Sequence, residues 1–404
     1  MDLLIFLAAV GVLWLAVGLG YRRYKLKARG VLLYPGAMIW RTTKGLGVID
    51  RLATKHKRLW SSYGTVAAAL GVFFMIFVFV NIILNAVVLL SQPARAVTGV
   101  TFVLPGLVPG LSIVAWLISV GLVLVIHEFS HGLLLRSQGL KTKFTGVMLF
   151  LFIPGAFVEP DEKELKKAPR HKRMKMFAAG PVSNVVFSFF FLFLLLVFLV
   201  PKSGVYVYAV ADNYPAENLA ENLLGAKILA IENQGLRTPI DTYENFSKFL
   251  LQSSPGENIV LSTDKGDYPL TLANSPDNEN IGTIGILTIT STPRSDFINP
   301  LLVLGSAVGV FLGAPVFHPF VYDAIVPWAV IDVLKWLFVL NIGVGLFNLL
   351  PAKPLDGGYL FEALLEKKAS RERARKIVKV FSFLVLFLIL VNLVPSLLRR
   401  AFGG

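Results

Sequence analysis

The stretch "IHEFSHGLLLR" at residues 126–136 places two histidines and a glutamate at the end of a long apolar run. His127 and His131 are four residues apart, which in a helix puts both imidazoles on one face, one turn apart. Two such imidazoles can bind one zinc ion, and Glu128 between them can act on a metal-bound water as a general base. Ionisable groups are costly within an apolar run and mark functional sites there. The stretch therefore predicts a zinc site in a membrane-embedded helix.

The composition is that of a membrane protein, since the chain of 404 residues is 55% hydrophobic and only 16% charged. Backbone in lipid has to satisfy its own hydrogen bonds, which a helix does. We therefore expect a polytopic α-helical membrane protein with about six transmembrane helices, each formed by an apolar run of roughly 20 residues. The runs are residues 2–19, 65–91, 111–135, 177–200, 328–350 and 377–397.

The net charge of +14 is concentrated beside the apolar runs. Residues 21–64 contain eleven Lys or Arg and one acidic residue, and residues 136–176 contain ten against four. Residues 201–299 contain six against twelve acidic residues. The positive-inside bias explains this pattern better than nucleic-acid binding, so we expect no nucleic-acid partner. A multi-pass protein of the cell membrane is expected, with both basic segments cytoplasmic and residues 201–299 extracytoplasmic.

The N-terminal run has its basic residues after the apolar segment. This order favours a retained first span with its N-terminus outside, and a cleaved signal peptide is the alternative. The chain contains no cysteine, so thiolates are excluded as nucleophiles and as metal ligands.

Three segments depart from the pattern of spanning helices. Residues 144–160, "FTGVMLFLFIPGAFVEP", are apolar but interrupted by Gly and Pro, which predicts a hairpin that dips into the membrane. Residues 203–295 contain short strand-like runs and one helical run, which predicts an inserted soluble α+β domain. Residues 298–320 cannot cross the membrane alone if the acidic domain is outside, so we expect a re-entrant or surface segment there.

A catalytic zinc site needs a third protein ligand beside an open coordination position. Acidic residues are scarce near the other spans. The segment "NLLPAKPLDGG" at residues 348–358 follows an inward run and ends near the same membrane face as HEFSH. We therefore predict Asp356 as the third ligand of one Zn²⁺ per chain, although "PLDGG" by itself would indicate only a turn.

The chain resembles the site-2 proteases, a family of intramembrane zinc metalloproteases. The resemblance rests on HEFSH, on "GPVSN" at residues 180–184 and on "NLLPAKPLDG", which matches the pattern N-x-x-P-x-x-x-x-D-G. It implies that His127, His131 and Asp356 bind zinc and that Glu128 is the catalytic base.

The same resemblance implies roles for three more residues and for the inserted domain. Asn348 would stabilise the oxyanion or hold substrate backbone. Gly180 and Asn184 would belong to a G-x-x-x-N element, where close helix packing with a structural hydrogen bond is an equal alternative to a catalytic role. The inserted domain would be PDZ-like, and it would either bind a peptide or exclude substrates with large ectodomains.

A substrate helix hides its peptide carbonyls in hydrogen bonds and has to unwind before hydrolysis. The predicted hairpin could hold the unwound segment by β-augmentation, with Phe144, Val147 and Leu149 as candidate substrate-binding residues. The alternative is that the hairpin only plugs the membrane face of the site.

The function implied by the resemblance is a zinc metalloendopeptidase that cleaves single-span membrane proteins within their transmembrane segments, near the cytoplasmic face. The alternative is a catalytically inactive membrane adaptor that works through its PDZ-like domain. The domains expected are residues 1–110 (N-terminal helices and basic loop), 111–200 (first part of the catalytic core), 203–295 (PDZ-like domain), 298–326 (re-entrant or surface segment), 328–360 (second part of the core) and 361–404 (basic segment and last helix).

Overall fold

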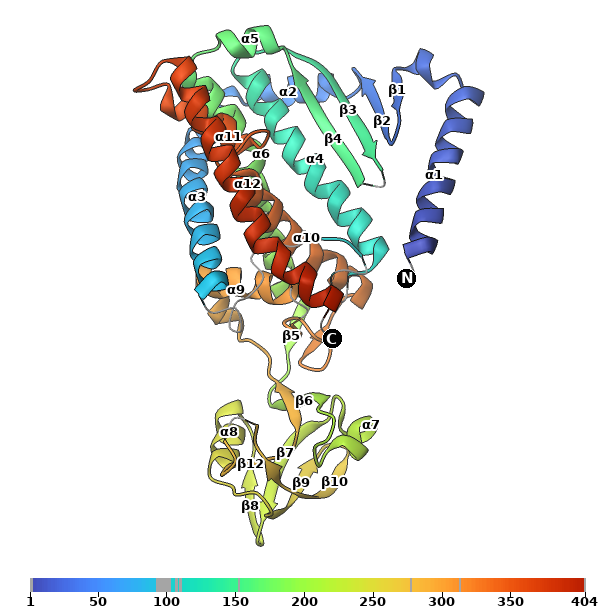
Figure 1. The fold of residues 1–404 in the computed structure, drawn as a ribbon, viewed down its shortest axis with the longest axis vertical. Coiled ribbons are helices and arrows are strands. Elements are labelled where there is room, and N and C mark those ends of the chain that lie inside the picture. Colours follow the sequence, from blue (N-terminus) through green and yellow to red (C-terminus); the bar gives the residue numbers. More distant parts are fainter. Residues whose placement is uncertain are drawn as a thin grey trace. The chain divides into compact units, whose positions relative to one another are not determined.

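The computed structural model describes residues 3–91, 103–105, 108, 111–151, 153–276, 278–311 and 314–402. The chain forms two compact units. One consists of Met1–Leu192 with Trp336–Gly404, and the other of Phe193–Lys335. Most helices and strands of the two units are labelled in Figure 1.

Five of the described helices are long and apolar enough to cross a bilayer. They fall on five of the predicted runs, which confirms a polytopic helical membrane protein. The sixth run, residues 2–19, falls on α1 (Leu3–Arg23), whose first side chains lie outside the described residues. The five helices are α3 (Lys57–Ser91), α4 (Ile113–Ser137), α6 (Arg170–Phe198), α10 (Trp328–Asn348) and α12 (Arg371–Phe402).

Helix α6 approaches two neighbouring helices very closely. A Cβ atom added to Gly71 on α3 would lie 2.9 Å from the Cβ of Ala178 on α6. One added to Gly345 on α10 would lie 2.7 Å from the carbonyl oxygen of Pro181 on α6. Because no side chain fits at either point, glycine is required for the observed packing. Small residues at helix interfaces are the usual means of close packing in membranes.

A four-stranded antiparallel sheet packs against α4 in the first unit (Figure 1). The strand order is β1-β2-β3-β4, so β4 is an edge strand, whereas β3 pairs on both sides. Strands β3 and β4 form the hairpin expected at residues 144–160. Strands β1 and β2 come from the basic segment 21–64, where no strand was predicted. The bounds are β1 (Val31–Tyr34), β2 (Ala37–Thr42), β3 (Thr142–Phe150) and β4 (Ile153–Pro160).

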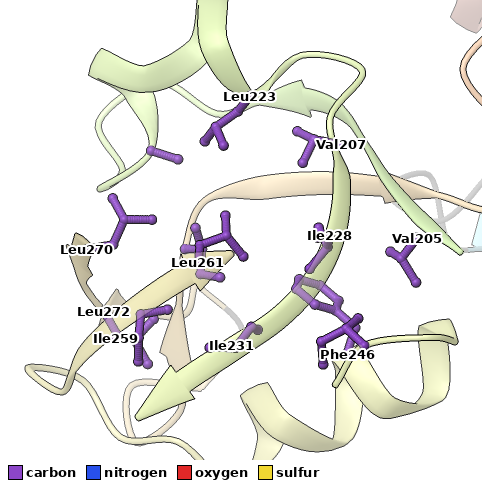
Figure 2. Packing of buried hydrophobic residues seen from close by; sticks show 13 residues of the cluster. Val205, Val207, Leu223, Ile228, Ile231, Phe246, Ile259, Leu261, Leu270 and Leu272 are labelled. Carbon is purple, nitrogen blue, oxygen red and sulfur yellow. The ribbon is translucent and has the colours of Figure 1, made fainter. Parts of the chain in front are cut away.

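The second unit contains the sheet-rich region that the sequence predicted. Its antiparallel sheet has the order β10-β9-β7-β6-β13, with β8 paired to β7. The core contains the fully buried Ile231 and Leu261, and Phe246 of the helix α8 packs into the same cluster (Figure 2). The bounds are β6 (Val205–Val210), β7 (Lys227–Asn233), β8 (Leu236–Pro239), α8 (Tyr243–Leu251), β9 (Asn258–Thr263), β10 (Gly266–Thr271) and β13 (Ile286–Ile289).

Residues 298–320 include α9 (Pro300–Phe311), an apolar helix of 12 residues. Such a helix is about 18 Å long, which is less than the roughly 30 Å of a hydrocarbon core. A helix of this length does not span a bilayer by itself, and the re-entrant or surface placement stays a prediction. The remaining elements are η1 (Leu26–Arg29), α2 (Leu46–Lys55), α5 (Glu162–Lys167), β5 (Leu199–Pro201), η2 (Glu217–Leu219), α7 (Ala220–Leu223), β11 (Ala273–Asn274), β12 (Gly282–Thr283), η3 (Arg294–Ile298), β14 (Tyr322–Ala324) and α11 (Asp356–Leu365).

Candidate metal centre

Helix α4 brings the two histidines of HEFSH together. The imidazole centroids of His127 and His131 are 4.8 Å apart, and their Nε2 atoms are 3.2 Å apart. Both side chains are buried. The four-residue spacing therefore produces the convergence that the sequence predicted.

Asp356 reaches the same point from a distant part of the chain. Its Oδ2 atom lies 3.0 Å from His127 Nε2 and 3.2 Å from His131 Nε2. It is the first residue of α11, directly after the turn that follows α10. The predicted third ligand is thus in contact with both imidazoles.

Two glycines allow the turn at Asp356 to fold tightly. A Cβ atom added to Gly357 would overlap the carbonyl group of Leu349. One added to Gly358 would lie 2.5 Å from the carbonyl carbon of Ala352. The sequence "DGG" therefore forms the start of α11, and its two glycines let this helix begin close against the preceding turn.

The three ligand atoms have a geometry and a chemistry that suit zinc. They form a nearly equilateral triangle with sides of 3.0, 3.2 and 3.2 Å. A tetrahedral site with zinc–ligand distances of about 2.0–2.1 Å has edges of about 3.3–3.4 Å. Two imidazole nitrogens and one carboxylate oxygen also match the donor set of catalytic zinc sites with an open position. His127, His131 and Asp356 therefore form a group that could hold a metal ion.

Helix α6 engages the outer nitrogen of each imidazole. His131 Nδ1 lies 2.8 Å from the backbone carbonyl oxygen of Met176, to which its N–H donates. His127 Nδ1 lies 3.3 Å from the side-chain amide of the fully buried Asn184. The Oδ1 atom of Asn184 has no hydrogen-bond partner among the described residues. Rotating the amide group by 180° exchanges its oxygen and nitrogen, so that Oδ1 accepts a hydrogen bond from the Nδ1–H of His127. Such contacts fix the tautomer and leave Nε2 free to bind a metal.

Gly180 gives the two imidazoles room against α6. A Cβ atom at this position would overlap His131 Nε2 and would lie 2.9 Å from His127 Cδ2. The GPVSN motif thus contributes clearance at Gly180 and a hydrogen bond at Asn184. Both residues thus contact the two imidazoles, and the choice between a structural and a catalytic role for them stays a prediction.

Glu128 projects from α4 toward the sheet. Its Oε2 atom accepts a hydrogen bond of 2.9 Å from the backbone N–H of Val158 on β4. Glu128 is half-buried; it directly follows His127 in the chain and precedes His131 by three residues. It is therefore held between the histidine pair and the edge strand of the sheet.

Among the described residues, no hydrogen bond joins Asn348, Phe144, Val147 or Leu149 to the three ligands. Asn348 ends α10, is half-buried and makes no side-chain hydrogen bond to any described residue. Phe144, Val147 and Leu149 lie on β3, where both strand edges are already paired. The free edge of the hairpin belongs to β4.

Sequence reasoning missed the backbone groups of Met176 and Val158 at this site. Neither residue type has a side chain that could have indicated a role, because both act through the peptide group. The only available signal was the position of Met176 on the helix that contains GPVSN.

The comparisons with known proteins identify the class of protein as a peptidase. A family model described as peptidase family M50 matches residues 115–392, a range that contains both histidines and Asp356. The match covers more than half of the chain, so the chain belongs to peptidase family M50. The resemblance to the site-2 proteases is thereby confirmed.

Relatives of the chain come from archaea, bacteria and plants. It is 28% identical over 354 residues to an uncharacterized protein of Methanocaldococcus jannaschii, covering 87% of this chain and 83% of the relative. It is 26% identical over 297 residues to the zinc metalloprotease RasP of Bacillus licheniformis, covering 66% and 69%. An 88-residue segment is 32% identical to a membrane-bound transcription factor site-2 protease homolog of Arabidopsis thaliana, covering 21% and 17%.

Replacing Gly180 with alanine is expected to weaken zinc binding at least about tenfold, a loss typical of disturbed ligand orientation. The added methyl group would push the His131 imidazole away from Asp356. Competition with a chelator on the purified protein measures the affinity. Gly121→Ala on α4 is the control, because no atom lies within 4 Å of a Cβ there. Equal zinc affinity in Gly180→Ala and the parent protein would contradict the expectation.

Proposed function

We propose that this protein is an intramembrane zinc metalloprotease that cleaves single-span membrane proteins within their transmembrane segments. The observation that supports this most is the convergence of His127, His131 and Asp356 beside Glu128. Membership of peptidase family M50 supports the same chemistry. One Zn²⁺ per chain would be held by the two imidazoles and the carboxylate.

The bound zinc would supply Lewis-acid polarisation of the substrate carbonyl and would lower the pKa of water. Glu128 takes the proton of the attacking water and passes it to the leaving amine. Asn348, whose amide is free among the described residues, donates a hydrogen bond to the substrate carbonyl oxygen.

The unwound substrate segment pairs with β4, the edge strand of the sheet. Backbone groups of alternate residues point to one edge of an antiparallel strand. Since the N–H of Val158 points away from β3 toward Glu128, the N–H of Ala156 points to the same free edge. An added strand there would lie beside the metal ligands, which makes β4 a better candidate than the β3 residues Phe144, Val147 and Leu149.

Pairing with β4 also affects the catalytic base. Before substrate binds, the Glu128 carboxylate accepts a hydrogen bond from the N–H of Val158. A substrate carbonyl that takes over this N–H releases the carboxylate to accept a proton. Substrate placement and activation of the base are thus coupled through one peptide group.

The sheet-rich second unit is proposed to be a PDZ-like, extracytoplasmic domain that binds a peptide or excludes substrates with large ectodomains. Its six-stranded antiparallel sheet with one main helix supports this assignment. The distribution of charge supports the sidedness, with the basic segments and the metal centre near the cytoplasmic face.

Glu128→Gln is expected to lower the turnover number for a model transmembrane substrate at least about 100-fold, the usual contribution of a general base. Its zinc content should equal that of the parent protein, because the substitution leaves all three ligands in place. His127→Ala should lose both zinc and cleavage. A Glu128→Gln protein that cleaves at the parent rate would exclude the proposed mechanism.

Ala156→Pro is expected to reduce cleavage while zinc content stays unchanged, since proline removes the N–H that faces the free edge. Proline is tolerated on edge strands when the missing N–H points away from the sheet. Ala156→Val is the matched control, because it retains the N–H and a β-branched side chain suits a strand. Equal cleavage by both variants would show that β4 does not pair with the substrate.

Single cysteines test the sidedness directly, since the chain has none of its own. Leu236→Cys on β8 and Lys163→Cys on α5 both replace exposed residues. In intact cells, an impermeant maleimide should label the first variant, and it should label the second only after permeabilisation. The reverse pattern would contradict the proposed topology.

A further inference from the structure

The first unit contains a cavity of about 550 Å³ that the proposed reaction does not use. It lies between the turn that precedes Asp356 and one face of α12. Its volume is within the range of ordinary small-molecule sites, about 300–1,000 Å³.

The lining of this cavity changes from charged to apolar along α12. Arg375 and Lys379 line one part, and Phe383, Leu386 and Ile389 line the rest. These positions recur every three or four residues and therefore share one face of the helix. Lys379 and Ile389 are about 15 Å apart along the helix axis, which is close to half of a hydrocarbon core of roughly 30 Å. The lining from its charged end to its apolar end is therefore about as long as one membrane leaflet is thick.

The charged part has an excess of positive charge. Glu362 accepts hydrogen bonds from Lys353 and from Arg375, the latter at 3.3 Å from its Nε atom. Lys379 is exposed and has no ion-pair partner among the described residues. Three cations thus line the cavity while one carboxylate contacts two of them. The remaining acids of this region, Glu366 and Glu372, pair with other basic residues.

We propose that this cavity binds one anionic phospholipid. Its phosphate lies at Arg375 and Lys379, and one acyl chain lies along Phe383, Leu386 and Ile389. Basic pockets between membrane helices are known to bind anionic headgroups, and each basic residue contributes about 1 kcal/mol near a charged membrane surface. A free phosphate would leave the apolar part without a partner, and an uncharged lipid would leave the cations without one.

The bound lipid supports the turn that holds Asp356. Ser382 on α12 accepts a hydrogen bond of 3.0 Å from the backbone N–H of Lys353 in this turn. Leu355, the residue before Asp356, lines the cavity itself. A lipid in the cavity therefore stabilises both α12 and the turn, and its loss is expected to weaken zinc binding. This consequence rests on the proposed metal site, whereas lipid binding does not.

Native mass spectrometry of the full chain, supplied with equal amounts of phosphatidylglycerol and phosphatidylcholine, tests the charged part. The parent protein should retain one phosphatidylglycerol in preference to phosphatidylcholine. Lys379→Gln should reduce this retention about fivefold, the equivalent of about 1 kcal/mol. The control is Arg373→Gln, which removes one positive charge from an exposed residue of the same helix that does not line the cavity. This control should reduce phosphatidylglycerol retention less than about twofold. Equal losses in both variants would indicate general surface attraction and would overturn the proposal.

A second pair of variants tests the apolar part. Leu386→Trp should fill the cavity and abolish lipid retention, whereas Leu384→Trp, at an exposed residue outside the lining, should not. If a transmembrane substrate crosslinks at position 386 without displacing any lipid, the cavity holds substrate and not lipid. That result would refute the proposal. The lipid measurements are repeated on Glu128→Gln protein. The Glu128→Gln protein has to retain as much phosphatidylglycerol as the parent protein. This result would separate lipid binding from the proposed protease function.

Discussion

The structure depends on the meeting of three polar atoms within a predominantly apolar bundle. Polar groups buried without partners destabilise a fold, and buried charges do so strongly unless they are paired or bind a metal. The Nε2 atoms of His127 and His131 and the Oδ2 atom of Asp356 lie 3.0 to 3.2 Å apart and so satisfy this requirement together. They come from segments more than 200 residues apart, so α4 and the turn before α11 have to be held in register by everything that packs around them.

Helix α6 provides much of this support. It engages the outer nitrogens of the imidazoles through Met176 and Asn184, and it leaves space for the rings only because residue 180 is glycine. The same helix accommodates α10 closely at Gly345, which positions the start of the Asp356 turn. One helix thus sets the orientation of two ligands and the approach of the third. A motif of small and amide residues is consequently as important to the metal centre as the ligands themselves.

The parts of this arrangement that the sequence predicted are those set by local periodicity or by membrane topology. The spacing of His127 and His131 requires only helix geometry, and Asp356 follows from counting spans and matching membrane faces. The pairing of β2 with β3 was not predictable, because it joins strands about 100 residues apart and basic residues obscure the short apolar runs. The hairpin was recognised, but which of its strands has the free edge depends on that same long-range pairing. The sequence therefore points to the inner strand β3, whereas the free edge belongs to β4.

The position of β4 at the edge of the sheet also explains how Glu128 is accommodated. A half-buried carboxylate needs a hydrogen-bond donor, and none of the ion pairs in the described part of the chain includes Glu128. The outward N–H of Val158 meets this need only because no further strand pairs with β4. If β4 were an interior strand, this N–H would be bonded within the sheet and the carboxylate would have no donor there. The strand order therefore determines whether the proposed base has a hydrogen-bond donor. The HEFSH motif determines where on α4 this base lies.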